Sequence, residues 1–315
     1  MDPRGWGEIL FTIGVTVALG SRGTLSVTYV PSVSGSYKTD ALFDVTGYFT
    51  PDMDGNTFTP VTPARVLDSR HGTGISATLP ARQAKEFPVA GSDGIPADAV
   101  AVTGTLTVTG QTGRGYVYLG PDNSGSPTTS TINFPTGDNR ANGVTVPLSS
   151  KGSLFVTYIP SSAGNYKTDV IFDVTGYFSK SPTGATYSPL NPSRLLDTRR
   201  GTGLKGTFTA RSSRTFQVAG HGGVPVAAIA VTGNLTVTNQ GSRGYLYIGP
   251  TAMNTPKTSN LNFPVGDNRA SGAVVPLSGT GTLSVTYVAS SSGSYRTDVI
   301  FDVTGYFQLI PASGS

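Results

Sequence analysis

The heptapeptide Phe-Asp-Val-Thr-Gly-Tyr-Phe at residues 172–178 decides how this chain is organised, because it occurs three times. The same seven residues stand at 43–49 and at 301–307, and the aspartate at positions 44, 173 and 302 sets the repeat at 129 residues. A Leu-x-Val-x-Tyr segment precedes each copy at a constant distance. The chain therefore holds two complete copies of one unit and the second half of a third.

A repeat of 129 residues has the size of an ordinary domain, so each complete copy can bury its own core. We predict a truncated repeat over residues 1–50 and two full units over 51–179 and 180–315. Solenoids and propellers repeat at shorter periods, which favours independently folding units arranged like beads on a string. A polar, turn-rich linker precedes each full unit.

The pattern inside each unit is typical of short strands. The 41 glycines and 22 prolines make up about a fifth of the 315 residues and divide the chain into short segments. Ala and Thr alternate with the apolar residues Val100, Val102, Leu106 and Val108, and this alternation predicts a strand with one buried face. Gly104 and its counterpart Gly233 interrupt this strand and predict a bulge or a close backbone approach. No segment has helical periodicity, so we expect an all-β fold of tandem antiparallel β-sandwiches with Greek-key or jelly-roll connections.

Composition excludes several classes of protein. Cysteine is absent, which argues against a disulfide scaffold. Lys and Arg are scattered singly and the net charge is only +4, so the chain lacks the basic stripe of a nucleic-acid binder. No apolar run reaches the ~18 residues of a membrane span. Residues 9–20 look like the apolar region of a signal peptide, but residues 14–20 align with 143–149 and are interpreted as a repeated strand.

The residues that occur in both units provide little material for catalysis. The two histidines, His71 and His221, align with Arg200 and Ser92, and Glu86 aligns with Thr215. A repeated general base, nucleophile pair or metal-ligand set is therefore missing, and we predict neither an enzyme nor a cofactor or metal. Residues 52–56 faintly resemble a calcium loop, but the matching linker lacks carboxylates and a polar turn is favoured.

Aspartate and arginine are the charged residues that recur. Asp173 stands between apolar neighbours, where a carboxylate needs an arginine partner, and Arg65 or Arg70 is the leading candidate. Asp302 is expected to be buried in the same way beside Arg194 or Arg199. The predicted structural charge pairs involve Arg65, Asp68, Arg70, Asp173, Arg194, Asp197, Arg199 and Asp302. The alternative interpretation is a sugar or anion site built from the same groups.

A second set of repeated residues could bind a ligand. Alternating tyrosines can present an aromatic platform to a sugar, and arginine can bind an anion, although tyrosines in a strand are also ordinary sheet residues. The candidates are Tyr116, Tyr118, Arg140, Tyr245, Tyr247 and Arg269.

The half copy is expected to form three strands within residues 14–49, with bare apolar faces and no arginine for Asp44. A neighbouring unit, an identical half from a second chain or a preceding module could cover these faces. Self-association into a homodimer or array through residues 14–49 is the expectation. Residues 1–13 match no part of the repeat.

The ordered series of motifs resembles a known family. Pro-x-Arg-Leu-Leu-Asp-Thr-Arg at 192–199, Gly-Gly-Val-Pro at 222–225, Val-Thr-Gly-Asn-Leu-Thr-Val-Thr at 231–238 and Asp-Val-Thr-Gly-Tyr-Phe at 302–307 look like a largely uncharacterised module of exported bacterial proteins. In that family the modules stand in tandem or are appended to secreted hydrolases. The resemblance implies export and a non-catalytic role, and it transfers no functional residues. The absent signal peptide and front half suggest a fragment of a longer array.

The sequence thus favours a non-catalytic, extracellular or cell-surface repeat protein that serves as an adhesion or spacer module. Weak binding of a polysaccharide or cell-wall glycan is the expected partner interaction, without nucleic acid or membrane. The alternative is a polysaccharide-binding module of a larger secreted hydrolase.

Overall fold

The computed structural model describes residues 12–52 and 54–309, and it contains antiparallel strands and no α-helix in these ranges. The predicted all-β class is confirmed. The first unit comprises β1 (Thr57–Asp68), β2 (Leu79–Pro80), β3 (Lys85–Pro88), β4 (Ala101–Thr109), β5 (Gly115–Gly120), β6 (Ile132–Phe134), β7 (Arg140–Pro147), β8 (Ser153–Pro160) and β9 (Lys167–Ser179). The second comprises β10 (Ala185–Asp197), β11 (Phe208–Thr209), β12 (Arg214–Gln217), β13 (Ala228–Thr238), β14 (Gly244–Gly249), β15 (Leu261–Phe263), β16 (Arg269–Pro276), β17 (Thr282–Ala289) and β18 (Arg296–Leu309).

Each unit is a sandwich of two sheets. In the first unit the strand orders are β1-β9-β4-β7 and β3-β8-β5-β6, and in the second they are β10-β18-β13-β16 and β12-β17-β14-β15. The short strands β2 and β11 extend the edges of β9 and β18. Of the two predicted topologies this order is the jelly roll, in which consecutive long strands cross between the sheets.

The core of each unit lies between its own two sheets. Val102, Leu106 and Val108 are fully buried, as the alternation predicted. Val100 is an exception, since it precedes β4 and is 41% exposed. The alternating threonines Thr103 and Thr105 are also buried. Both faces of this sheet are therefore covered, because its outer face lies against the neighbouring unit.

The glycines within the long strands mark the predicted irregularities. The pairing of β4 with β9 shifts between Thr103 and Gly104, and the pairing of β13 with β18 shifts between Thr232 and Gly233. A side chain on Gly104 would overlap the carbonyl oxygen of Asp173. The structure thus contains both the bulge and the close backbone approach.

The units are packed together rather than strung out, which corrects the bead-like arrangement expected from the sequence. Three equivalent glycines, Gly14, Gly143 and Gly272, meet at one point. A methyl group on Gly14 would overlap the carbonyl oxygen of Gly143, one on Gly143 would overlap that of Gly272, and one on Gly272 would overlap that of Gly14. This closed cycle places the three copies around a pseudo-threefold axis.

Aromatic side chains repeat the same symmetry. The ring centroids of Phe49, Phe178 and Phe307 form a triangle with sides of 6.0, 6.2 and 6.0 Å. Phe58 lies 4.1 Å from Phe307, and its counterpart Tyr187 lies 4.4 Å from Phe49. The aromatic residue that follows each linker therefore packs its ring against the next copy around the axis.

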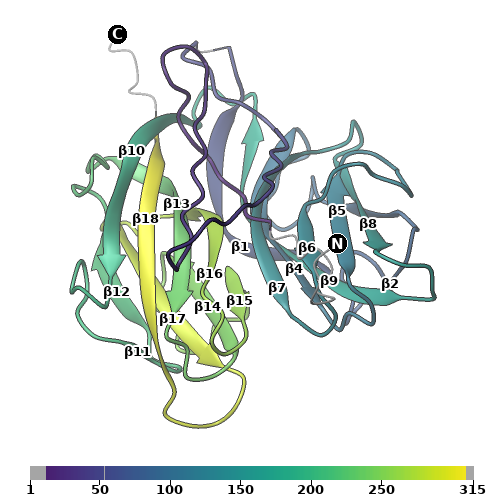
Figure 1. Cartoon of the computed structure of the whole chain (residues 1–315). Helices are drawn as coiled ribbons and strands as arrows, with labels where there is room; N and C mark the ends of the chain where they lie inside the picture. The colour runs from purple at the N-terminus through teal and green to yellow at the C-terminus, as the bar shows by residue number, and fades with distance from the viewer. Residues whose placement is uncertain (1–11, 53, 310–315) are drawn as a thin grey trace.

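The half copy occupies the third position without forming sheet. Figure 1 shows residues 12–49 as a purple trace lying against the two sandwiches. The structure assigns no strand within residues 12–52, so the three predicted strands are absent there. The expectations for residues 1–11, including the first part of the signal-like stretch, lie outside the described residues.

Candidate functional site

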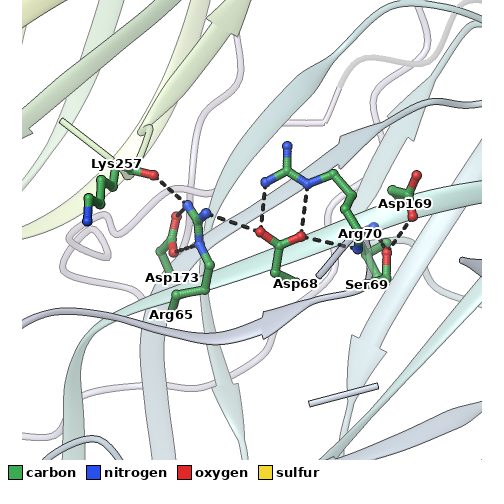
Figure 2. A network of polar contacts seen from close by, with 8 residues as sticks. Arg65, Asp68, Ser69, Arg70, Asp169, Asp173 and Lys257 are labelled. Carbon is green, nitrogen blue, oxygen red and sulfur yellow. Dashed lines mark hydrogen bonds and ion pairs between the residues drawn. The ribbon is translucent and has the colours of Figure 1, made fainter. Parts of the chain in front are cut away.

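Strand pairing brings the recurring charges together in the first unit. Arg65 on β1 stands opposite Asp173 on β9 in the ladder. The Arg65 guanidinium donates from Nε to Asp173 Oδ1 at 2.8 Å and from Nη2 to Oδ2 at 3.1 Å. This bidentate geometry is the strong form of an arginine–carboxylate contact. Figure 2 shows the pair between Asp68 and the main-chain carbonyl of Lys257, which comes from the other unit.

Asp68 holds the turn that follows β1. Its carboxylate accepts from Arg70 Nε at 2.8 Å and Nη2 at 2.7 Å, and from Arg65 Nη1 at 3.2 Å. The hydrogen bond from Arg70, with further help from Arg65, lowers the pKa of Asp68 despite its burial. Arg70 is therefore the partner of Asp68, and Arg65 links Asp68 to Asp173.

The second unit repeats this network with the same chemistry. Arg194 Nε lies 2.8 Å from Asp302 Oδ1 and its Nη2 3.0 Å from Oδ2, while Arg199 binds Asp197 at 2.9 and 2.8 Å. The exposure differs between the units. The Asp302 side chain is 27% exposed and that of Asp173 only 3%. The expected burial of Asp302 is thus wrong, and the described residues place no counterpart of the Lys257 carbonyl against Arg194.

Burial and pairing shift the carboxyl groups in opposite directions. Desolvation raises the pKa of Asp173, and the hydrogen bonds and charge of Arg65 offset this only in part. The hydrogen bond from Arg199 lowers the pKa of Asp197 to about 2. The network of the first unit therefore combines a carboxyl whose pKa burial raises, Asp173, with one whose pKa its arginine partner lowers, Asp68.

The lowered pKa of Asp197 predicts acid sensitivity. A carboxyl with a folded pKa below its unfolded value stabilises the fold above pH ~4, and this stabilisation is lost as the pH falls from about 4 toward 2. We expect Asp197→Asn to lower the urea midpoint at pH 7 and to make the decline between pH 5 and pH 2 shallower than in the unmodified protein. Parallel midpoint curves for the two proteins would contradict the assignment.

Sequence reasoning missed one polar partner in each unit. Ser69 Oγ donates to Asp169 Oδ1 at 2.7 Å, and Thr198 Oγ1 donates to Asp298 Oδ1 at 2.6 Å. The same hydroxyls accept from the backbone N–H of Val170 and Val299. The recurrence of a hydroxyl residue directly after Asp68 and Asp197 was the signal available in the sequence.

The tyrosine candidates are engaged in the fold to different degrees. Tyr116 and Tyr245 are half-buried, and their hydroxyls donate to the carbonyls of Pro127 and Pro256 at 2.8 Å. Tyr118 is also half-buried. Tyr247 is 1% exposed and offers no ring face to a ligand. Only the first unit therefore has two partly exposed candidate tyrosines, Tyr116 and Tyr118, for the predicted sugar platform.

The arginine candidates lie between the units. Arg140 binds Asp138 at 3.0 Å and the carbonyl of Asn133 at 2.9 Å. Arg269 binds Asp267 at 2.7 Å and also reaches Asp138 of the first unit. Both side chains are only 9% exposed. Their charges join neighbouring strands and copies rather than facing solvent.

The calcium-like segment forms a turn. Asp52 Oδ1 accepts from Thr50 Oγ1 at 3.0 Å and from the Asp54 N–H at 3.3 Å, as a capped polar turn does. Met53 lies outside the described residues. Among residues 12–52 and 54–309 no cluster of three or more His, Cys, Asp or Glu side chains could hold a metal ion. The same ranges contain no helix with the length and hydrophobicity of a membrane span.

Comparisons with known proteins do not establish a family. No family model matches the chain, and no curated protein matches it. Among solved structures, the tandem CBM22-1–CBM22-2 domain of Paenibacillus barcinonensis Xyn10C is 9% identical with a TM-score of 0.20, covering 79% of this chain and 98% of that one. A structure of Sulfolobus turreted icosahedral virus is 11% identical with a TM-score of 0.16, covering 84% and 99%.

Proposed function

We propose that this protein is a non-catalytic adhesion module that acts outside the cell or at its surface, with weak affinity for a polysaccharide or cell-wall glycan. The observation that supports the proposal is the use of the repeated charges. Arg65, Arg70 and Arg269 are bound to carboxylates within or between units, so the features shared by the copies serve as scaffold. The close packing of the copies around one axis favours a compact adhesion head over an extended spacer.

The half-exposed pair Tyr116 and Tyr118 on β5 is the proposed sugar contact in the first unit. Aromatic rings with polar tips provide contact area for sugars at low entropic cost. Tyr118 also lies near Asp122, whose carboxylate can accept hydrogen bonds from sugar hydroxyls. The contact is expected to be weak because the Tyr116 hydroxyl is already bonded to Pro127.

Sedimentation with insoluble cellulose, chitin and peptidoglycan sacculi tests this function. We expect at least one polymer to retain the full chain. Retention should be reduced in Tyr118→Ala and unchanged in His71→Ala, because His71 is exposed and does not belong to β5. A thermal melt of each variant separates lost binding from lost folding. Absence of retention on every polymer would refute glycan adhesion, and release of soluble reducing sugar would refute the non-catalytic assignment.

A further inference from the structure

The outer face of the small sheet in the first unit carries side chains that the second unit does not repeat. Leu154 and Val156 of β8 are fully buried in the core, so Phe155 between them points to the opposite side of the sheet. Phe155 is partly exposed there. Ser26 and Ser284 stand at the equivalent positions of the other copies. Phe155 is thus an aromatic ring that the repeat itself does not require.

A second ring lies on the strand beside Phe155. The ladder between β5 and β8 places Gly120 opposite Phe155, and side chains of such a pair start about 5 Å apart. A methyl group on Gly120 would overlap the hydroxyl end of the Tyr118 ring, so this ring leans along β5 over the glycine. The two half-buried rings are therefore neighbours on one face, which we call the Tyr118–Phe155 platform.

The connection between β5 and β6 borders the platform on one side. The carbonyl of Ser124 accepts from Thr157 Oγ1 at 2.8 Å, and Thr157 stands opposite Tyr118 in the ladder. The next row of the same face holds Phe155 and, on β3, the exposed Glu86. Figure 1 shows β5 and β8 on the side of the first sandwich that is remote from the second sandwich, which leaves this row open to a ligand.

Two carboxylates flank the platform. Glu86 stands opposite Phe155, and its Oε1 accepts from Ser153 Oγ at 2.6 Å. Burial raises the pKa of Tyr118 and the charge of Asp122 adds to this rise, which places the Asp122 carboxylate beside the tyrosine hydroxyl. Among residues 12–52 and 54–309, no lysine or arginine forms a salt bridge with either carboxylate. Both negative charges are therefore available to a bound cation.

The second unit closes the same place with neutral side chains. The glutamate and the phenylalanine are replaced by Thr215 and Ser284, whose hydroxyls are hydrogen-bonded to each other at 2.8 Å. The aspartate is replaced by Thr251. Tyr247, the counterpart of the partly exposed tyrosine, is only 1% exposed. Within residues 180–309 no equivalent of the platform is formed.

We propose that the Tyr118–Phe155 platform, together with Glu86 and Asp122, binds a glycan of amino sugars whose amines are free and positively charged. An aromatic ring offers an apolar surface to a sugar and attracts a cation to its π-face. A carboxylate only accepts hydrogen bonds, and those donated by an ammonium group are stronger than those donated by hydroxyls. The inference rests on the proposed glycan-binding function and names the class of sugar that the site selects.

The overall charge of the chain does not explain this preference. The net charge is +4, which repels a polycation and attracts an acidic polymer. Binding of an amino-sugar glycan therefore depends on the local carboxylates, and salt should weaken it by screening them. The same two carboxylates repel an acidic glycan at the platform, so they set specificity as well as affinity.

Titration calorimetry of the full chain with three oligosaccharides of equal length tests the selectivity. The probes are a chitosan oligomer, its fully N-acetylated form and an oligogalacturonate, all in slightly acidic buffer. We expect the chitosan oligomer to bind most tightly and the oligogalacturonate least. Glu86→Gln and Asp122→Asn should each weaken chitosan binding about threefold to fivefold, the range for accessible ion pairs. Phe155→Ser, which introduces the residue of the second unit, should weaken it about tenfold, as loss of an aromatic anchor does.

Asp98→Asn is the matched control for charge, because it removes an exposed carboxylate that belongs neither to β3 nor to the β5–β6 connection. Its chitosan affinity should equal that of the unmodified protein. An equal loss in this control would overturn the proposal, as would unchanged binding in both Glu86→Gln and Asp122→Asn. These two variants keep the shape of the side chain, so they carry the test if Phe155→Ser lowers the melting temperature.

The outcomes separate this inference from the proposed function. Retention on cellulose, chitin or sacculi without tighter binding of the chitosan oligomer than of its acetylated form would overturn the amino-sugar preference and leave glycan adhesion standing. Absence of binding to every polymer and every oligosaccharide would refute both.

Discussion

Replacing Asp173 with alanine is expected to lower the free energy of unfolding of the first unit by about 3–5 kcal/mol, the cost typical of removing one partner of a buried ion pair. The Asp173 side chain is 3% exposed and receives two hydrogen bonds from Arg65. Its removal leaves the Arg65 guanidinium between Asp68 and the Lys257 carbonyl without its main counter-charge. The loss should appear as faster hydrogen exchange of the most protected amides in β9.

Asp302→Ala is the matched control, because it removes the same contact from the equivalent strand. The Asp302 side chain is 27% exposed, so water can replace part of the lost interaction. A loss of about 1 kcal/mol or less, the range for accessible pairs, is therefore expected. Equal losses from the two variants would show that burial does not set the strength of the pair.

The difference between these pairs shows where the sequence stops being informative. The apolar neighbours of Asp173 indicate an arginine partner, but only the register of β1 against β9 selects Arg65 rather than Arg70. The sequences around Asp173 and Asp302 are identical. Their exposure differs all the same, and the neighbouring unit places the Lys257 carbonyl against Arg65, the partner of Asp173, which a pattern within one unit cannot reveal.

The fold class follows from the sequence more directly than the arrangement of the units. Period-two alternation and frequent turns suffice for an antiparallel sandwich, and the jelly-roll order then limits which strands can pair. Residues 14–49 have the same alternation but pair with no strand. Their counterparts β7, β8 and β9 pair with strands from the first half of a unit, β1–β5, and not with one another. Local propensity therefore predicted strands that the absence of ladder partners prevents.

The pseudo-threefold axis left a signal in the sequence that needs the structure to interpret. Gly143 and Gly272 lie within strands β7 and β16, where glycine weakens a strand unless another backbone approaches closely. They recur with Gly14 at the repeat spacing. The structure supplies the reason, since a methyl group added to any of the three glycines would overlap the carbonyl oxygen of another.

Gly143→Ala is therefore expected to separate the two complete units. The added methyl group would overlap the carbonyl oxygen of Gly272 and lie 2.7 Å from its carbonyl carbon, and both are backbone atoms that no side-chain rotation can move. Overpacking of this kind costs about 1–3 kcal/mol or more. Calorimetry should show a lower first transition or two resolved ones, while Gly279→Ala, which meets nothing within 4 Å, should melt like the unmodified protein.

Gly272→Ala tests the third side of the cycle independently. The three atoms nearest its methyl group all belong to Gly14, so we expect the two complete units to remain packed while residues 14–49 leave the axis. The expected result is an unchanged main transition with faster exchange and readier proteolysis confined to 14–49. If Gly272→Ala instead separates the complete units, or if Gly143→Ala leaves them together, the copies do not meet at the glycines in solution and the pseudo-threefold packing is wrong.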